Sequence, residues 1–278
     1  MKSFALGLRF RDLHRSGTLV LPNAWDAASA AIAAAAGAEA VATTSSGISW
    51  SLGVPDGEQL SRADMIDVVA RVARSVDVPV SADVEAGYGP VPSDVAATIA
   101  AVIDAGAVGA NLEDRLRTDD GPLWPIARQC ERLAAARDAA DRSGVAFVLN
   151  ARTDVFLAAV GDPADREGMV LERAEAYRRA GADCLFVPGL VDLDAIARLV
   201  RASALPLNVM LSPGQSPTIR QLAEAGVRRI SAGHAVAGVA YGATGLAMRE
   251  LLAGRDGALR DGASHGDMQQ LMARPAAR

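Results

Sequence analysis

Short apolar runs alternate with longer segments of helical periodicity along most of this chain. The runs have the length and composition of buried strands. The segments between them are rich in Ala, Arg and Glu and predict helices, as at 94–103, 126–140 and 166–180. The predicted strands are Thr18–Leu21, Glu39–Thr43, Val78–Asp83, Val108–Glu113, Ala146–Ala151, Asp183–Val187, Leu205–Val209 and Val227–Ser231.

Several predicted helices end on an alanine and a glycine directly before the next apolar run, as at Gly37, Gly106 and Gly181. Glycine readily adopts the left-handed backbone that ends a helix. Eight strand–helix units joined in this way predict a (β/α)8 TIM-type barrel. The alternative is an open doubly wound sheet, which needs a glycine-rich turn after its first strand. Residues 22–26 follow the first strand and contain no glycine, so the barrel is favoured.

No linker divides the 278 residues, so we expect one barrel domain over residues 1–254 and a C-terminal tail over 255–278. The Ala-rich run 27–36 is too short to span a membrane and predicts a buried helix. The N-terminus lacks the apolar core of a secretory signal. Two cysteines, Cys130 and Cys184, are too few for a disulfide framework. We therefore expect a cytoplasmic protein without a membrane partner.

The charge balance excludes some classes of function. The formal net charge is −5 and no dense Lys/Arg block occurs, which argues against nucleic acid as a partner. Lys2 is the only lysine and precedes the barrel, so an aldolase with a Schiff-base lysine is also excluded.

Acidic residues gather where the predicted strands end, and barrel enzymes place their active sites at that end. Asp83 and Glu85 are two residues apart and face one side of an extended strand. Glu113 ends the next strand, and Asp56 lies in the loop after the second. Converging carboxylates repel one another unless a cation neutralises them, and Mg²⁺ suits oxygen ligands, with Mn²⁺ as the alternative. Arg152, ending the fifth strand, would offer a cationic fork to a substrate carboxylate.

Each of these acids has a simpler explanation, because Asp and Glu at such junctions commonly cap the following helix. For Asp56 both roles stay open, and for Asp114 we expect a mainly structural role. The coincidence of acids at several strand ends with Arg152 favours a shared site.

In combination these motifs resemble the isocitrate lyase/phosphoenolpyruvate mutase superfamily. That family consists of (β/α)8 barrels whose eighth helix is exchanged between subunits, which implies a homodimer or homotetramer here, with 235–252 as the exchanged helix. Its members bind Mg²⁺ and stabilise the enolate of pyruvate or a related oxo acid. The likeness covers residues 21–252 and rests on Ser51–Asp56, Ala82–Gly89, Asn111–Asp114 and Ala151–Asp154.

The resemblance implies a role for each matching residue. Asp83 corresponds to the direct metal ligand, and Asp56, Glu85 and Glu113 to acids that reach the metal largely through water. Arg152 corresponds to a substrate-binding and catalytic arginine, and Asp56 is also a catalytic candidate. The residues implied to hold the substrate carboxylate and oxo oxygen are Thr44, Ser45 and Ser46, with Asn208 as a weaker candidate.

The chain departs from the family where general acids are expected. The loop 115–124 contains no Cys, Lys or His, although the lyases carry a catalytic cysteine there and the mutases a Lys-Thr-Asn-Ser motif. Residues 187–189 lack the Glu or His of both groups. A reaction that needs little acid catalysis is therefore favoured, such as oxaloacetate decarboxylation. His234 is a catalytic candidate, with a helix-entry role as the alternative, and His14 and His265 are expected on the surface.

Three hypotheses follow. The leading one is a Mg²⁺-dependent lyase that breaks a C–C bond in a small 2-oxo or 2-hydroxy (di)carboxylic acid through a pyruvate-type enolate. The second is phosphonopyruvate hydrolase- or mutase-like chemistry on a C–P bond. The third is a non-catalytic protein that only binds an oxo acid.

Overall fold

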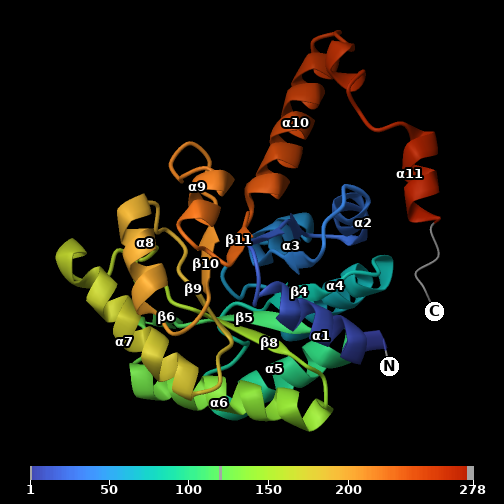
Figure 1. Ribbon diagram of the computed structural model, residues 1–278. Coiled ribbons are helices and arrows are strands. Elements are labelled where there is room, and N and C mark those ends of the chain that lie inside the picture. The colour runs from blue at the N-terminus through green and yellow to red at the C-terminus, as the bar shows by residue number, and fades with distance from the viewer. Residues whose placement is uncertain (1, 119–120, 274–278) are drawn as a thin grey trace.

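Eight parallel strands close into a barrel (Figure 1). A computed structural model describes residues 2–118 and 121–273. Two short strands, β1 (Leu19–Leu21) and β2 (Asn23–Ala24), are the two halves of one strand, separated by Pro22. Because β1 pairs with β11 and β2 pairs with β3, this divided strand closes the sheet. The predicted (β/α)8 barrel is confirmed.

All eight predicted strands are present, although most are shorter than expected. The sequence did not predict an antiparallel hairpin of β6 (Arg115–Thr118) and β7 (Gly121–Leu123), which occupies the loop after β5. The other barrel strands are β3 (Val41–Thr43), β4 (Val80–Asp83), β5 (Gly109–Glu113), β8 (Val148–Arg152), β9 (Cys184–Phe186), β10 (Leu207–Met210) and β11 (Arg229–Ser231).

Helices surround the barrel and pack on its outward-facing side chains. Several begin at a residue whose side chain accepts a hydrogen bond from the first turn, such as Asp26, Ser61 and Asp192. The expected helix over 27–36 exists, but its predicted burial is wrong, since only Ala30 and Ala31 in it are buried. The helices are α2 (Ala27–Ala35), α3 (Ser45–Ser51), α4 (Arg62–Ser75), α5 (Pro92–Asp104), α6 (Ile126–Ser143), α7 (Arg166–Arg179), α8 (Leu193–Ala202) and α9 (Ile219–Glu224), with a short 3₁₀ turn, η1 (Pro163–Asp165).

An additional helix, α1 (Lys2–Leu13), covers the N-terminal end of the barrel. Its Phe10 is fully buried against inward-facing strand residues. Gly109 makes room for this ring, because a Cβ there would lie 2.7 Å from it. His14 was expected on the surface, and this is wrong. It is 5% exposed, packs edge-to-face on Phe10 and bonds through Nδ1 to the Phe10 carbonyl.

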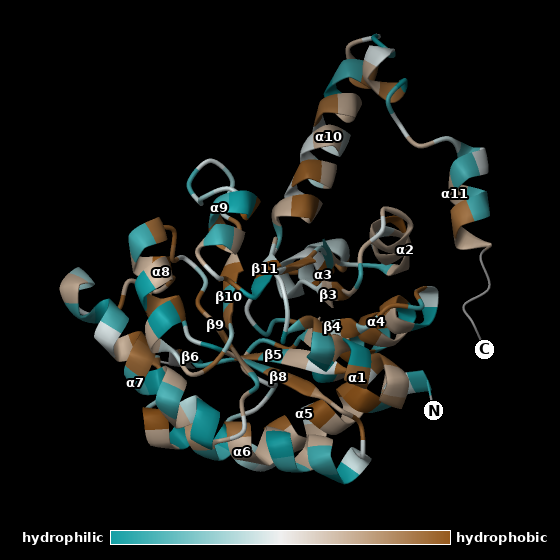
Figure 2. Cartoon of the chain, in the orientation of Figure 1, coloured by the Kyte–Doolittle hydropathy of each residue, from teal (hydrophilic) through white to brown (hydrophobic). Residues whose placement is uncertain are grey.

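The last long helix, α10 (Ala235–Leu252), projects away from its own barrel (Figure 1). Apolar residues continue along it (Figure 2), and Val239 is 74% exposed. On β1, Val20 is also largely uncovered. After α10 the chain forms a short turn, η2 (Gly257–Leu259), and α11 (His265–Met272), which lies near α2. The division into a barrel domain and a tail at 254 stays a prediction.

No helix in the described part of the chain is both long and apolar enough to cross a membrane.

Candidate active site

Asp83 ends β4 at the carboxyl end of the barrel, and neighbouring groups fix its position. Its N–H donates to Thr43 Oγ1 (2.8 Å), and its Oδ2 accepts the N–H of Ser45 (3.1 Å). Ser45 begins α3, directly after Thr44 at the N-cap. The other oxygen, Asp83 Oδ1, is buried and has no hydrogen-bond partner among residues 2–118 and 121–273. A buried oxygen without a hydrogen-bond partner destabilises the fold unless a ligand interacts with it.

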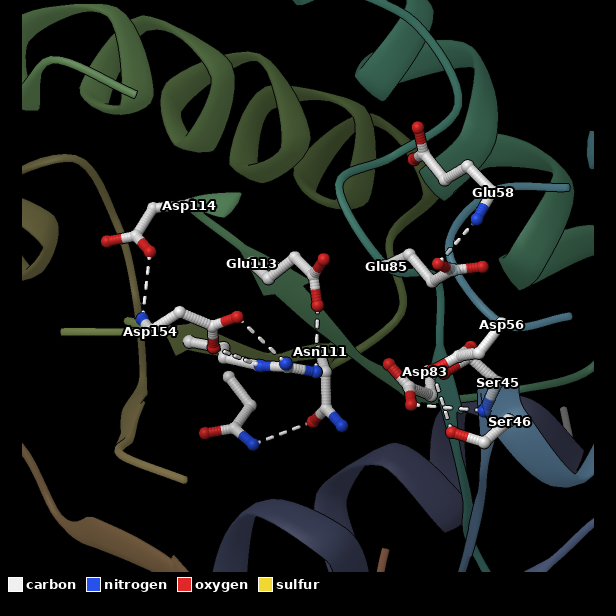
Figure 3. A network of polar contacts seen from close by, with 12 residues as sticks. Ser45, Ser46, Asp56, Glu58, Asp83, Glu85, Asn111, Glu113, Asp114 and Asp154 are labelled. Atoms are coloured by element: carbon white, nitrogen blue, oxygen red, sulfur yellow. Dashed lines mark hydrogen bonds and ion pairs between the residues drawn. The ribbon is translucent and has the colours of Figure 1, made fainter. Parts of the chain in front are cut away.

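Two loops bring further acids to the same side of the site (Figure 3). Ser46 Oγ donates to Asp56 Oδ2 (2.8 Å). Glu58, which sequence reasoning missed, donates its N–H to Glu85 Oε2 (2.7 Å). The loop after α3 is thus tied both to α3 and to the loop after β4. The structure therefore brings Ser45, Ser46 and the acids Asp56, Asp83 and Glu85 together, as the sequence predicted.

The loop after β4 holds an unusual backbone. Four of its residues, Glu85, Gly87, Tyr88 and Gly89, have positive φ, with 49° at Glu85 and 58° at Tyr88. Left-handed backbone at non-glycine residues costs about 1–3 kcal/mol and is concentrated at functional sites. Burial raises the pKa of Tyr88 above its usual range, and the carboxylates of Glu85 and Asp83 raise it further. The loop therefore borders a region of concentrated negative charge.

On the other side of the site, Arg152 lies between two carboxylates. Its Nη1 is 2.7 Å from Glu113 Oε2, and its Nε and Nη2 donate to the two oxygens of Asp154 (2.7 and 3.0 Å). Burial alone would lower the pKa of Arg152, but Glu113 and Asp154 raise it above its ordinary value. The guanidinium is charged and held in one orientation.

A second, fully buried set of contacts holds Asp154 in place. Asp114 Oδ1 accepts the N–H of Asp154 (2.9 Å), while Asp114 Oδ2 accepts from Tyr177 Oη (2.7 Å) and Arg173 Nη1 (3.1 Å). Burial raises the pKa of Asp114, and Arg173 offsets part of that rise. These contacts agree with the structural role expected for Asp114.

Asp154 lies in the sequence motif Ala151–Asp154 but had no predicted role, and Arg173 and Tyr177 were not predicted at all. The contact of Asp154 with Arg152 could have been inferred, because residues two apart in an extended chain point to the same side. Arg173 and Tyr177 are four apart on α7, which aligns them on one helix face. Nothing in the local sequence indicates that this face meets Asp114.

The donor set fits a metal held by one protein oxygen and by water. In the described part of the chain, no three His, Cys, Asp or Glu side chains converge closely enough to hold a metal by themselves. Mg²⁺ commonly keeps several of its waters and takes only one or two carboxylates, and the unpartnered Asp83 Oδ1 offers such a ligand. The ligand roles of Asp56, Glu85 and Glu113 stay predictions.

Two predicted residues lie apart from this cluster. His234 is exposed at the start of α10 and packs edge-to-face on Trp50, with ring centroids 5.6 Å apart. Asn208 is fully buried in β10, beside Arg229 of β11, and accepts from Ser231 Oγ. Within the described residues neither has a hydrogen bond to the acids or to Arg152. The catalytic role of His234 and the substrate contact of Asn208 stay predictions.

With this geometry in view, the chain can be compared with known proteins. Residues 10–252 match the family model of phosphoenolpyruvate phosphomutase. The chain belongs to that family. The crystal structure of a candidate phosphonomutase from Burkholderia cenocepacia J2315 is 45% identical, with a TM-score of 0.83, covering 89% of this chain and 99% of that one.

Curated relatives of this family member include lyases. The 2-methylisocitrate lyase of Salmonella typhimurium is 32% identical over 72% of this chain and 68% of its own length. The oxaloacetate decarboxylase of Pseudomonas entomophila is 29% identical over 86% of this chain and 82% of its own. The protein is an enzyme of the isocitrate lyase/phosphoenolpyruvate mutase superfamily.

Proposed function

We propose that this enzyme is a Mg²⁺-dependent lyase acting on a small 2-oxo or 2-hydroxy (di)carboxylic acid, with Mn²⁺ as an alternative metal. The observation that carries the proposal is that Asp83, whose buried Oδ1 has no partner within residues 2–118 and 121–273, lies at the same end of the barrel as the fixed cation Arg152. Asp83 would hold the metal, and Asp56, Glu85 and Glu113 would surround its waters.

Arg152 and α3 supply the contacts for an oxo acid. Three of the five N–H groups of Arg152 are used by Glu113 and Asp154, which leaves two for a substrate carboxylate. Thr44, Ser45 and Ser46 lie beside Asp83 and would contribute hydroxyl and N–H groups. Mg²⁺, when bound, supplies Lewis-acid stabilisation of the oxygen that becomes negative.

Oxaloacetate decarboxylation is the reaction that this set of residues supports best. The bond to the departing carboxylate breaks, CO₂ leaves, and the electron pair forms the enolate of pyruvate, which then takes a proton from water. This sequence of steps needs no cysteine or lysine, and residues 115–124 contain none. Donors fixed around the oxygen that gains charge lower the barrier, because they need no reorganisation during the reaction.

Cleavage of a C–P bond is the second candidate, favoured by the 45% identity to the candidate phosphonomutase. It would use the same acids and Arg152, with a phosphonate in place of the departing carboxylate. The two candidates differ in their products, since one releases CO₂ and the other phosphate or a rearranged phosphate ester.

The test is to incubate the purified enzyme and Mg²⁺ with oxaloacetate, isocitrate, methylisocitrate and phosphonopyruvate, and to identify the products. We expect pyruvate and CO₂ from oxaloacetate. The Asp83→Asn variant should reduce this rate by about 100-fold or more. Asp67→Asn, an exposed aspartate on α4, is the matched control and should behave as wild type. Turnover of phosphonopyruvate alone would support the second candidate. Binding of oxo acids without any turnover would overturn both in favour of a non-catalytic binding protein.

We also propose that α10 packs on a second copy of the chain, in a homodimer or homotetramer. The exposed apolar residues of α10 and the uncovered outer face of β1 at Val20 support this exchange. Light scattering should give a dimer or larger, and removal of residues 235–278 should reduce it to a monomer. A monomeric full-length chain would contradict the exchange. The cytoplasmic location and the absence of a nucleic-acid partner stay predictions.

A further inference from the structure

A cavity of about 200 Å³ lies beside the acid cluster, and its chemistry differs from that of the cluster. Glu58 and Ala86 line the cavity, and both adjoin Glu85, Glu58 through its N–H and Ala86 as the next residue in the chain. At roughly 30 Å³ per water, its volume holds about six waters or a short carboxylate-bearing chain. Its other walls include Pro90, Arg115, Leu116, Trp124 and Arg132.

Arg132 is part of the wall and is already engaged. Its Nη1 donates to the Gly89 carbonyl (2.8 Å), its Nη2 donates to the Ala86 carbonyl, and its guanidinium lies 4.8 Å from the centre of the Trp124 ring. These contacts hold the left-handed loop that carries Glu85 against α6. Arg132 therefore contributes positive charge to the cavity but has little freedom to follow a ligand.

Arg115, unlike Arg132, has a side chain that is not held by hydrogen bonds to other described residues. It follows Glu113 and Asp114 in the chain, at the start of the β6–β7 hairpin, and is half-buried. Its side chain has no hydrogen bond or ion pair with any residue in the described ranges. Glu58, the carboxylate among the described lining residues, accepts the N–H of Tyr88 (2.9 Å). Among the described lining residues, two arginines and one glutamate give a net positive charge.

We propose that this cavity binds a carboxylate at the far end of the substrate from its 2-oxo acid group and that Arg115 recognises it. The proposal rests on the proposed function, because the 2-oxo acid end of the same molecule would lie at Asp83 and Arg152. A guanidinium binds a carboxylate through two parallel hydrogen bonds, which a free arginine can arrange. Leu116, Trp124 and Pro90 would contact the aliphatic chain between the two acidic groups. The enzyme would then prefer dicarboxylic over monocarboxylic oxo acids.

The test compares three probes in the presence of Mg²⁺ by isothermal titration: oxalate, 2-oxobutyrate and 2-oxoglutarate. Oxalate and 2-oxobutyrate report on the Asp83–Arg152 end alone, whereas 2-oxoglutarate also carries a distal carboxylate. We expect Arg115→Gln to weaken 2-oxoglutarate binding by about 10-fold or more and to change the other two by less than about 2-fold. Arg115→Lys should lie between, since it keeps the charge without the planar fork. The matched control is Arg128→Gln, an exposed arginine on α6 outside the cavity.

Equal weakening of all three probes in Arg115→Gln, or equal wild-type affinity for 2-oxoglutarate and 2-oxobutyrate, would overturn the recognition role. Failure of oxalate to bind the wild type with Mg²⁺ would instead refute the proposed function. Binding of 2-oxoglutarate that is lost with Arg115 would support the cavity even then.

Discussion

Two arginines lie inside the same barrel, and their charged groups have different partners. Arg152, at the carboxyl end, lies between the carboxylates of Glu113 and Asp154. Arg229, on β11 deeper in the barrel, has no carboxylate in contact within the described part of the chain. Its Nη2 donates to Asn111 Oδ1 (3.1 Å) and Ser81 Oγ (3.3 Å), while its Nε and Nη1 are buried without partners.

The pKa values express the difference. The carboxylates raise the pKa of Arg152 despite its burial, whereas burial lowers the pKa of Arg229 to about 10. The fall from an ordinary value of 12.5 corresponds to roughly 3 kcal/mol. Asp83 is among the charges that partly offset this cost. The barrel thus has a cation without an ion-pair partner in its interior and more acids than arginines at its carboxyl end. A bound metal cation would balance the negative charge at the carboxyl end.

The largest expected effect comes from removing the compensated arginine. Arg152→Met leaves the buried Asp154 without its ion pair, which should lower the free energy of unfolding by about 3–5 kcal/mol. Loss of the substrate-binding fork should also reduce kcat/KM by about 100-fold or more. Denaturant unfolding and initial rates measure the two effects. Wild-type stability would show that Asp154 does not depend on Arg152.

The second effect is a pH dependence at the N-terminal end. Burial, together with the charge of Arg229, lowers the pKa of His14 from 6.5 to about 4. Between these values the unfolded chain binds a proton that the folded chain does not, so stability should fall as the pH drops from 6.5 to 4, by roughly 3 kcal/mol at most. His14→Gln should remove this part of the dependence in unfolding curves, whereas His265→Gln, on the surface, should not. Parallel curves for wild type and His14→Gln would contradict a buried neutral His14.

The smallest effect comes from removing the uncompensated arginine. Arg229→Met should leave the fold unchanged or stabilise it by about 1 kcal/mol, because it removes a buried charge without an ion-pair partner. It should also raise the pKa of His14, which NMR titration of the ring can follow. A loss of more than about 2 kcal/mol in denaturant unfolding would mean that Arg229 has a strong partner, and the comparison with Arg152 would fail.

Local patterns were enough to predict the strands and the acids at their ends. The junction glycines and apolar runs gave the barrel, and its topology brings Asp83, Glu85 and Arg152 to one end. Contacts between distant segments could not be predicted in this way. Tyr177 and Asp114 are 63 residues apart, and the direction in which Arg229 points depends on the register of β11 with β10. The burial of His14 depends on α1, whose pattern alone does not show that it covers the barrel end.

The most direct test of the central claim is the affinity for oxalate with and without Mg²⁺, measured by isothermal titration of the wild type, Asp83→Asn and the control Asp67→Asn. We predict that Mg²⁺ strengthens oxalate binding in the wild type and in Asp67→Asn, and that Asp83→Asn weakens the Mg²⁺-dependent binding by about 100-fold or more. Oxalate binding that is unaffected by Mg²⁺, or that is equally strong in Asp83→Asn, would contradict a metal and oxo-acid site at the carboxyl end of this barrel.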